Sequence, residues 1–411
     1  MEVIYKRCAG LDVHKETVVV CIAIREGGRL QKDIRTFHTM TSDLLSLHDW
    51  LLANGVDHVA MESTGIYWKP IYNLLEGSFT VLLVNAAHMK AVPGRKTDVK
   101  DCEWIADLLA HGLLKGSFIP PEDIRDLRDL TRYRKSLTDE RVREVNRLQK
   151  LLESANIKLS SVASDVMGVS GRDMLEALIS GKTDPQVLAD LARGKLRKKL
   201  PLLQQALNGR FRPHHQFLLG QILAHLDYLD EAIEQLSQEV EEHIAPFFQE
   251  IELLKTIPGV KQKVAEAIVA EVGTDMSHFP SDRHLASWAG LCPGNNESAG
   301  KRKSGKTRKG DRWLKRSLVE AALAISRSKE TYLSVLYHRI ARRRGAQKAT
   351  VAVSHAILVM AYHIIAEKLP YREFGADYFD RLNETYIKHN FVKRLESLGY
   401  EVTLKPLASC A

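Results

Sequence analysis

The hydrophobic pattern of the first part of the chain alternates between short apolar runs and longer stretches with helical spacing. Apolar and β-branched runs bounded by Gly, Pro or polar clusters predict strands, and they cover residues 18–24, 33–38, 56–61 and 79–84. Apolar residues that recur every three or four positions predict helices over residues 42–53, with Ser42 as N-cap, 66–75 and 98–114. Strands followed by strand–helix units predict a mixed α/β sheet domain over residues 1–119.

Beyond this domain the pattern is mainly helical. Residues 124–159 and 217–243 are two long amphipathic runs with apolar positions roughly every 3.5 residues, which indicates an antiparallel coiled-coil arm or a dimerisation stalk. Between them, residues 160–210 predict small helical insertions at best. The cations of the first run are expected on its outer side: Arg128, Arg132, Arg134, Lys135, Arg141, Arg143 and Arg147. The predicted divisions are therefore 1–119, a coiled-coil region 120–250, a mostly helical domain 251–370 and a C-terminal extension 371–411.

A turn near the start of the third region, Ile257-Pro258-Gly259-Val260, joins two helical stretches. A hydrophobic-Pro-Gly-hydrophobic turn resembles the helix-hairpin-helix element, whose backbone amides and following helix N-terminus face a phosphate. This interpretation assigns Gly259 and Lys261 to nucleic-acid binding. A plain packing corner between two helices is the alternative. Further helices are predicted over residues 313–326 and 349–369.

Positive charge is concentrated in one segment. The sequence has a formal net charge of +8, whereas residues 300–345 hold fifteen Lys and Arg against three acids, a local net charge of +12. The remainder therefore sums to about −4. A local excess of cations is typical of a protein that binds polyphosphate, because neutralised phosphates release condensed counterions. A solvated charged face is the alternative, although such faces usually mix both signs.

The cysteines and apolar stretches bear on where the protein acts. Five scattered cysteines without CxxC spacing argue against a disulfide framework or a zinc site and fit a reducing cytoplasm. No N-terminal signal segment is visible. The apolar stretch 349–365 includes polar residues and is shorter than the ~20 residues that cross a bilayer, so a buried helix and no membrane partner are predicted.

Four acids stand where predicted strands end or a predicted helix begins: Asp12, Glu62, Asp98 and Asp101. Hard divalent cations take oxygen ligands, and Mg²⁺ is commonly held by carboxylates with phosphate and water. Three elements that deliver acids to one end of a small sheet would suit two-metal phosphodiester chemistry, with Mg²⁺ or Mn²⁺ as cofactor. A capping role is the alternative for any single acid, but it explains the coherent set less well.

Small residues and closely spaced cations meet in segment 294–306, where a basic loop is expected. Ser298, flanked by Ala299 and Gly300, would present its hydroxyl with little steric cover, and the nearby cations could stabilise charge on a scissile phosphate. Composition alone favours a flexible loop with Ser298 as a turn residue, and Ser304 is an equal candidate. The cations assigned to nucleic-acid binding are Lys301, Arg302, Lys303, Lys306, Arg308, Lys309 and Arg312. The sequence contains no GxxxxGK[ST] loop, so it does not indicate an enzyme that hydrolyses nucleotides.

Six motifs, in order, resemble those of a family of insertion-sequence transposases. In this family an N-terminal RuvC-like domain carries a DEDD carboxylate set and a C-terminal transposase domain carries a serine. Some members are described as bridge-RNA-guided recombinases. The resemblance covers nearly the whole chain and runs through Gly10-Leu11-Asp12-Val13-His14-Lys15, Met61-Glu62-Ser63-Thr64-Gly65, Lys96-Thr97-Asp98-Val99-Lys100-Asp101, Ile257-Pro258-Gly259-Val260, Gly290-Leu291-Cys292-Pro293 and Ser298-Ala299-Gly300-Lys301.

The resemblance implies a role for each motif residue. Asp12, Glu62, Asp98 and Asp101 would bind the metal, and Ser298 would attack DNA to form a transient phosphoserine link. The implied enzyme cleaves and rejoins DNA strands for excision and insertion of a mobile element in a bacterial or archaeal cytoplasm, associated with the nucleoid when active. Its expected partners are DNA, a structured guide RNA and further copies of the chain in a dimer or tetramer, whose protomers together complete the active site.

Two other functions remain open from the residues. A metal-dependent endonuclease of the Holliday-junction type would use the same acids with water and no serine. A nucleic-acid-binding scaffold would use the acids for structure alone. The resemblance assigns no role to the extension 371–411.

Overall fold

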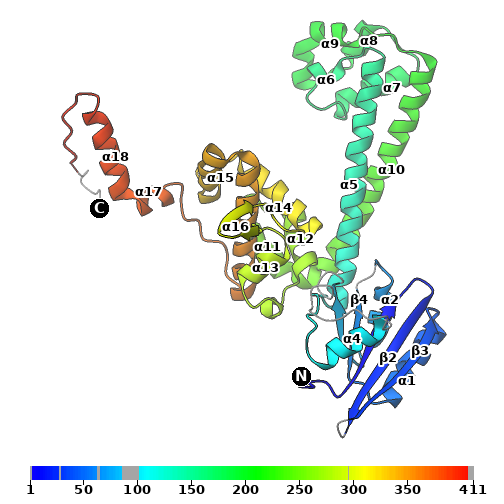
Figure 1. Cartoon of the computed structure of the whole chain (residues 1–411). Coiled ribbons are helices and arrows are strands. Elements are labelled where there is room, and N and C mark those ends of the chain that lie inside the picture. Colours follow the sequence, from blue (N-terminus) through cyan, green and yellow to red (C-terminus); the bar gives the residue numbers. More distant parts are fainter. Residues whose placement is uncertain (1, 27–28, 63–64, 86–100, 295, 406–411) are drawn as a thin grey trace. The chain divides into compact units, whose positions relative to one another are not determined.

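A computed structural model describes residues 2–26, 29–62, 65–85, 101–294 and 296–405, with the backbone alone for residues 296–298 and 302–304. The chain divides into two compact units, Met1–Ile119 and Pro120–Ala411, and each is described by itself (Figure 1).

The first unit is built on a five-stranded sheet of order β3-β2-β1-β4-β5, so the predicted mixed α/β sheet is confirmed. Strands β1, β2 and β3 form an antiparallel meander, while β4 and β5 run parallel to β1. The strands are β1 (Arg7–Val13), β2 (Thr17–Glu26), β3 (Arg29–His38), β4 (His58–Glu62) and β5 (Thr80–Val84).

Each face of this sheet has its own apolar core. Helices α1 (Thr41–Ala53) and α2 (Trp68–Leu75) pack on the face that includes Leu11 and Met61. Helix α4 (Asp101–Ala110) packs on the opposite face, against Cys8 and Ala60. Because side chains alternate along a strand, a strand that is covered on both faces supplies both cores. Strands β1, β2, β4 and β5 are therefore apolar in runs, whereas the edge strand β3 is mostly exposed.

Two helix ends in this unit differ from the sequence-based prediction. Ser42 was predicted as an N-cap, but α1 already begins at Thr41 and its N-cap is Met40, with no side-chain cap. The helix predicted over residues 98–114 ends at Ala110, and Gly112 follows with φ +66°. A left-handed glycine just after the last turn is a common way for a helix to end.

The second unit contains an antiparallel pair of long helices, α5 (Glu122–Ser154) and α10 (Pro213–Ile244). Their direction follows from three cross-contacts: Arg141 pairs with Asp230, Glu144 accepts from His225 at 2.8 Å, and Ser154 lies 3.4 Å from His215. Two long helices were predicted here, and they are confirmed. Supercoiling of the pair stays a prediction.

The segment between these helices is more ordered than predicted. It forms a helical cap at the end of α5 and α10, with its own apolar core that includes Leu159, Met174, Leu188 and Leu203 (Figure 1). The expected small helices are present, but the sequence did not indicate that the apolar residues spread over them build a shared core. The elements are α6 (Leu159–Val162), α7 (Val169–Ile179), α8 (Pro185–Asp190), the 3₁₀ helix η1 (Gly194–Lys199) and α9 (Leu200–Leu207).

The remaining part of the second unit is mostly helical and includes one β-hairpin, β6–β7. The sequence predicted neither this hairpin nor α13 and α15. The elements are η2 (Ala245–Phe247), α11 (Phe248–Lys255), α12 (Gln262–Val272), η3 (Met276–His278), α13 (Asp282–Trp288), β6 (Asn296–Ser298), β7 (Lys301–Ser304), α14 (Arg312–Ile325), α15 (Tyr332–Arg344), α16 (Ala346–Glu367), α17 (Tyr378–Leu382) and α18 (Glu384–Glu396).

Helix α16 is the core helix of this part. Within the described ranges it is the one helix long and apolar enough to cross a membrane. Half of its most apolar window is buried, and it packs against α11, α13, α14 and α15. These contacts support the predicted buried helix, because a core helix is apolar for the same reason as a membrane helix.

The C-terminal extension is joined to α15 by aromatic side chains. Tyr332 lies 5.0 Å from Tyr378 and 5.4 Å from Phe379, measured between ring centroids. The guanidinium of Arg339 lies over the ring of Phe379 at 4.9 Å. Helix α18 buries no residue of its own.

Candidate functional site

Two of the predicted metal-binding acids lie side by side at the end of the sheet. Strands β1 and β4 are parallel and pair Leu11 with Met61, so the next residues in register are Asp12 and Glu62. Asp12 lies two positions after Gly10, and Glu62 two positions after Ala60. Gly10 and Ala60 are on the side of the sheet that faces α4, and because side chains alternate along a strand, both acids point to that side as well. The Asp12 side chain is 22% exposed and lies 3.1 Å from His14 Nε2.

Helix α4 approaches this part of the sheet closely because Gly10 has no side chain. A Cβ at Gly10 would lie 2.3 Å from both the Ala106 nitrogen and the Cys102 oxygen, far inside contact distance. The Cys8 thiol donates to the Ala106 carbonyl at 3.5 Å, and burial raises the pKa of this thiol to about 12. Cys8 and Gly10 therefore act as packing positions for α4.

The direction of α4 places its first turn near the acids. The Ala110 carbonyl accepts from the amides of Ile4 and Tyr5 at 2.9 and 3.1 Å, before β1 begins. Cys102, at the other end of α4, lies against Gly10, two residues before Asp12. The helix therefore runs antiparallel to β1, and the exposed Asp101 lies toward the end of β1 that carries Asp12.

The set of four acids is only partly described. Asp98 lies outside the described residues. Within the described residues, no three His, Cys, Asp or Glu side chains form a ready-made metal site. The donor chemistry of Asp12, Glu62 and Asp101 nevertheless fits a hard divalent cation, since all three offer carboxylate oxygens.

Ser298 is the last residue of strand β6, directly before a two-residue turn. Ser298 pairs with Lys301, and the turn residues Ala299 and Gly300 have φ of 50° and 71°. Positive φ at both central residues is the mark of the type I′ turn, which matches the twist of a hairpin. The predicted loop is therefore a hairpin, and Ser304 lies at its opposite end.

The root of the hairpin is fixed by close backbone packing. The Gly294 amide donates to the Lys306 carbonyl at 2.9 Å. A Cβ at Gly310 would lie 2.3 Å from the Gly290 nitrogen, so both positions depend on glycine. Lys315 Nζ donates to the Gly290 carbonyl at 3.2 Å and to Thr307 Oγ1 at 3.0 Å.

The predicted nucleic-acid-binding cations surround this root. Lys301, Lys306, Arg308, Lys309 and Arg312 are exposed, and Arg312 lies over the Trp313 ring at 4.8 Å. The side chains of Arg302 and Lys303 lie outside the described atoms.

The Pro-Gly turn has features of both interpretations given above. Gly259 has φ +83°, and a Cβ there would lie 2.5 Å from Ile325 Cγ1, so the turn packs tightly against α14. Lys261 is the N-cap of α12, is exposed and provides no side-chain cap. The turn is thus a packing corner, and the helix start beside it is open. Phosphate binding there stays a prediction.

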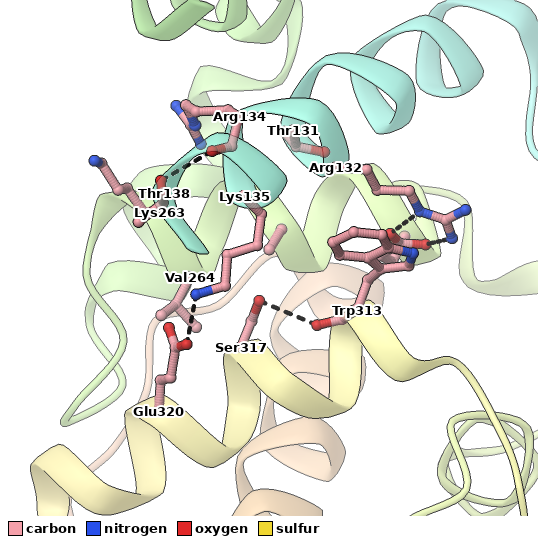
Figure 2. A pocket seen from close by; sticks show the side chains of 12 residues that line it. Thr131, Arg132, Arg134, Lys135, Thr138, Lys263, Val264, Trp313, Ser317 and Glu320 are labelled. Carbon is pink, nitrogen blue, oxygen red and sulfur yellow. Dashed lines mark hydrogen bonds and ion pairs between the residues drawn. The ribbon is translucent and has the colours of Figure 1, made fainter. Parts of the chain in front are cut away.

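The expectation that the cations of α5 lie on its outer side holds for Arg143 and Arg147, which are exposed. It is wrong for the cations near the start of the helix, which face other elements. Arg132 makes hydrogen bonds of 2.7 and 2.6 Å to the two Glu271 oxygens and one of 3.1 Å to Asp311. Arg134 pairs with the buried Glu266. Lys135 reaches Glu320 at 2.6 Å, and all three cations line a cavity of about 140 Å³ among α5, α12 and α14 (Figure 2).

This network connects α5 to the hairpin. Asp311 follows the hairpin root, accepts from the Trp313 and Leu314 amides at 2.8 Å and so caps α14. Burial alone would lower the pKa of Arg132, but hydrogen bonding to Glu271 raises it above its usual value. The sequence missed this network because pairing partners are 130 or more positions apart, and neither composition nor spacing indicates them.

Comparison with known families covers both candidate regions. A family model described as Transposase, of the DEDD type found in IS110, matches residues 9–157, which contain all four acids. A second, described as the Transposase IS116/IS110/IS902 family, matches residues 251–338, which contain Ser298. Together they cover more than half of the chain. The chain belongs to the IS110/IS116 family of transposases.

Individual relatives are more distant. The chain is 27% identical over 234 residues to the transposase for insertion sequence element IS1328 of Yersinia enterocolitica, covering 56% of this chain and 59% of that protein. It is 28% identical over 268 residues to the IS116 uncharacterized protein of Streptomyces clavuligerus, covering 57% of this chain and 65% of the relative. A pilin gene-inverting protein of Moraxella bovis is 28% identical over 122 residues, 29% of this chain and 38% of its own length. The match thus spans less than two thirds of each relative.

Proposed function

We propose that this member of the IS110/IS116 family is a DNA transposase, a site-specific recombinase that cleaves and rejoins strands at the ends of a mobile element. The observation that carries the proposal is the parallel register of β1 and β4, which brings Asp12 and Glu62 together on one face. The match of both family models, and the names of relatives that transpose or invert DNA, support it.

The acids would bind and position the scissile phosphate through a divalent cation. Asp12, Glu62, Asp98 and Asp101 would hold Mg²⁺ or Mn²⁺, which supplies Lewis-acid stabilisation of charge on the phosphate oxygens. Beside them, the His14 imidazole would orient the Asp12 carboxylate through the contact already present.

Ser298 would be the nucleophile. Its Oγ loses a proton and attacks phosphorus in line; one P–O bond to Ser298 forms as one P–O bond to deoxyribose breaks, and the leaving oxygen takes up a proton. A free hydroxyl of another strand then reverses the step. One phosphodiester is exchanged for another throughout, so no ATP is required. Lys301 and the neighbouring cations would stabilise the developing charge.

We also propose the partners implied by the family resemblance. These are DNA, a structured guide RNA and a dimer or tetramer of the chain, acting at the nucleoid in the cytoplasm. The acids and Ser298 lie in different units of the chain, and assembly of protomers would complete the active site.

The test uses a plasmid carrying the coding sequence of the chain with its natural flanking DNA. Excision circles are measured by junction PCR, and covalent protein–DNA adducts are trapped under denaturing conditions. Asp12→Ala and Glu62→Ala should abolish circles while leaving DNA binding intact. Ser298→Ala should abolish the adduct. Ser304→Ala, in the same hairpin, and Asp49→Ala, an exposed acid on α1, are the matched controls and should behave like the wild type.

Two outcomes would reject parts of the proposal. Normal exchange by Ser298→Ala would exclude the serine mechanism. Metal-dependent cleavage without any adduct in the wild type would instead identify a Holliday-junction-type endonuclease.

A further inference from the structure

A second concentration of cations lies in the helical cap, far from the basic hairpin in sequence. Residues 191–226 contain seven Lys and Arg and no Asp or Glu. The residues outside 300–345 have a slightly negative net charge in total, so the net charge of the chain does not reveal this local excess of cations. All seven side chains are exposed: Arg193, Lys195, Arg197, Lys198, Lys199, Arg210 and Arg212.

Most of these cations have no acidic partner. Arg193 pairs with Asp173 at 2.7 Å, and Lys199 Nζ donates to the Val162 carbonyl at 3.1 Å. Among the described residues the other five make no ion pair, and we call them the tip cations: Lys195, Arg197, Lys198, Arg210 and Arg212. Exposed cations without an ion-pair partner repel one another, and a polyanion relieves that repulsion.

The tip cations come from two segments of one folded cap. Among the tip cations of η1, Lys195 borders an open cavity of about 620 Å³, whose other wall is the loop and first turn over residues 162–171 and includes Asp165. Arg210 is fixed beside the end of α5, because its amide donates to the Ala155 carbonyl at 2.8 Å. The cap core holds both segments, so the cations are displayed on an ordered surface.

The arm separates this surface from the base of the second unit. Arg134 contacts α12 at the base, and Ser154 contacts His215 where the cap begins. At 1.5 Å per residue, this stretch of α5 is about 30 Å long. The hairpin and the cap would therefore contact nucleic acid at two separate places.

We propose that the tip cations form a second nucleic-acid-binding surface, which contacts the phosphate backbone of a duplex independently of the hairpin. Its chemistry is that of sequence-independent phosphate contacts, which position a duplex without reading its bases. A DNA duplex and a double-helical part of an RNA offer the same backbone charge. The inference uses the nucleic-acid partner of the proposed function but none of its catalytic steps.

The test measures binding of the full-length chain to two random-sequence probes of about 40 base pairs, one DNA and one RNA, which at roughly 3.4 Å per pair exceed the length of the arm. Fluorescence anisotropy across a salt series gives the slope of log K against log salt. The variant is Lys195→Gln/Arg197→Gln/Lys198→Gln. It spares Arg193 and Lys199, which make contacts within the cap.

The matched control removes three exposed cations from α18, in Lys388→Gln/Lys393→Gln/Arg394→Gln. Each lost phosphate contact should reduce the salt slope by about 0.9 for duplex DNA, so the tip variant should lose between 2 and about 3 and the control almost nothing. A loss seen with one probe alone identifies DNA or RNA as the partner.

Thermal unfolding monitored by circular dichroism checks that the variant cap is folded. As a readout independent of the substitutions, photo-cross-linking of thio-substituted probes to the wild type should give peptide adducts within residues 193–212. Unchanged slopes with both probes, or adducts confined to the hairpin, would overturn the proposal. This test is independent of the proposed serine mechanism, because Ser298→Ala should lose the covalent adduct but keep the full salt slope of binding.

Discussion

The base and the tip of the α5–α10 arm carry similar numbers of cations but use them differently. At the base, Arg132 and Arg134 point into an interface and each has a carboxylate partner. At the tip, Lys195 and Arg197 have no acidic partner among the described residues and face solvent. Charge density along a sequence therefore does not identify a binding surface. The presence or absence of acids from distant elements decides whether a cation stabilises the fold or remains available to a ligand.

The largest expected effect is on stability and comes from the buried pair at the base. Arg134 is 6% exposed and Glu266 4%, so Arg134→Ala would leave a buried carboxylate without its partner. Breaking such a pair costs about 3–5 kcal/mol, measured as loss of unfolding free energy in urea. Arg141→Ala, which breaks an exposed pair with Asp230, is the matched control and should cost less than about 1 kcal/mol.

The double variant Arg134→Met/Glu266→Leu separates charge from packing. Apolar replacement of both partners should recover most of the lost stability, because no charge is then left buried. If Arg134→Ala were as stable as the Arg141→Ala control, the stability of the base would not depend on this buried ion pair.

A smaller effect is expected at the residue that links the network to the hairpin. Asp311→Ala removes the N-cap of α14 and one partner of Arg132, and a lost cap costs about 0.5–2 kcal/mol. Asp311→Asn keeps a capping side chain and should retain most of this stability. Thermal unfolding compares the two; equal losses would show that the ion pair, rather than the cap, is the stabilising contact.

The smallest effect on stability is expected at the hairpin. Lys301, Arg308 and Lys309 are exposed and make no ion pair in the described part of the chain. Lys301→Gln/Arg308→Gln/Lys309→Gln should therefore change the unfolding free energy by less than about 0.5 kcal/mol. The salt slope of DNA binding should nevertheless fall by roughly 2 to 3. A destabilised variant with an unchanged slope would show that these cations stabilise the fold, as those at the base do, and do not bind DNA.

Some parts of the fold could be read from local patterns. Strands β2 to β5 and the long helices α5 and α10 overlap the runs that predict them, whereas β1 was noticed only as the apolar run that Asp12 ends. The hairpin was missed because its strands are three and four residues long and consist of polar residues, so no alternation marks them. The cap was underestimated because each of its helices is short, and the core that stabilises them is assembled from all of them.

The candidate site divides in the same way. Asp12 and Glu62 were predicted from their positions at the ends of apolar runs, and the register of two parallel strands places them together. Gly10 was noticed only as part of a motif, whereas the structure shows that α4 could not approach β1 with any side chain there. A close approach of two backbones depends on a contact across 92 or more residues, which no local pattern contains.

The sequence by itself determined the element types, the acids at the ends of apolar runs and the excess of cations in residues 300–345. These properties depend on neighbours in the chain, through hydrogen bonding, side-chain periodicity and local charge. Only the tertiary structure decided which cations are neutralised, which acids share a face of the sheet and where a second unpaired cationic surface lies. Burial and ion pairing depend on elements far apart in sequence, and they become fixed when those elements pack.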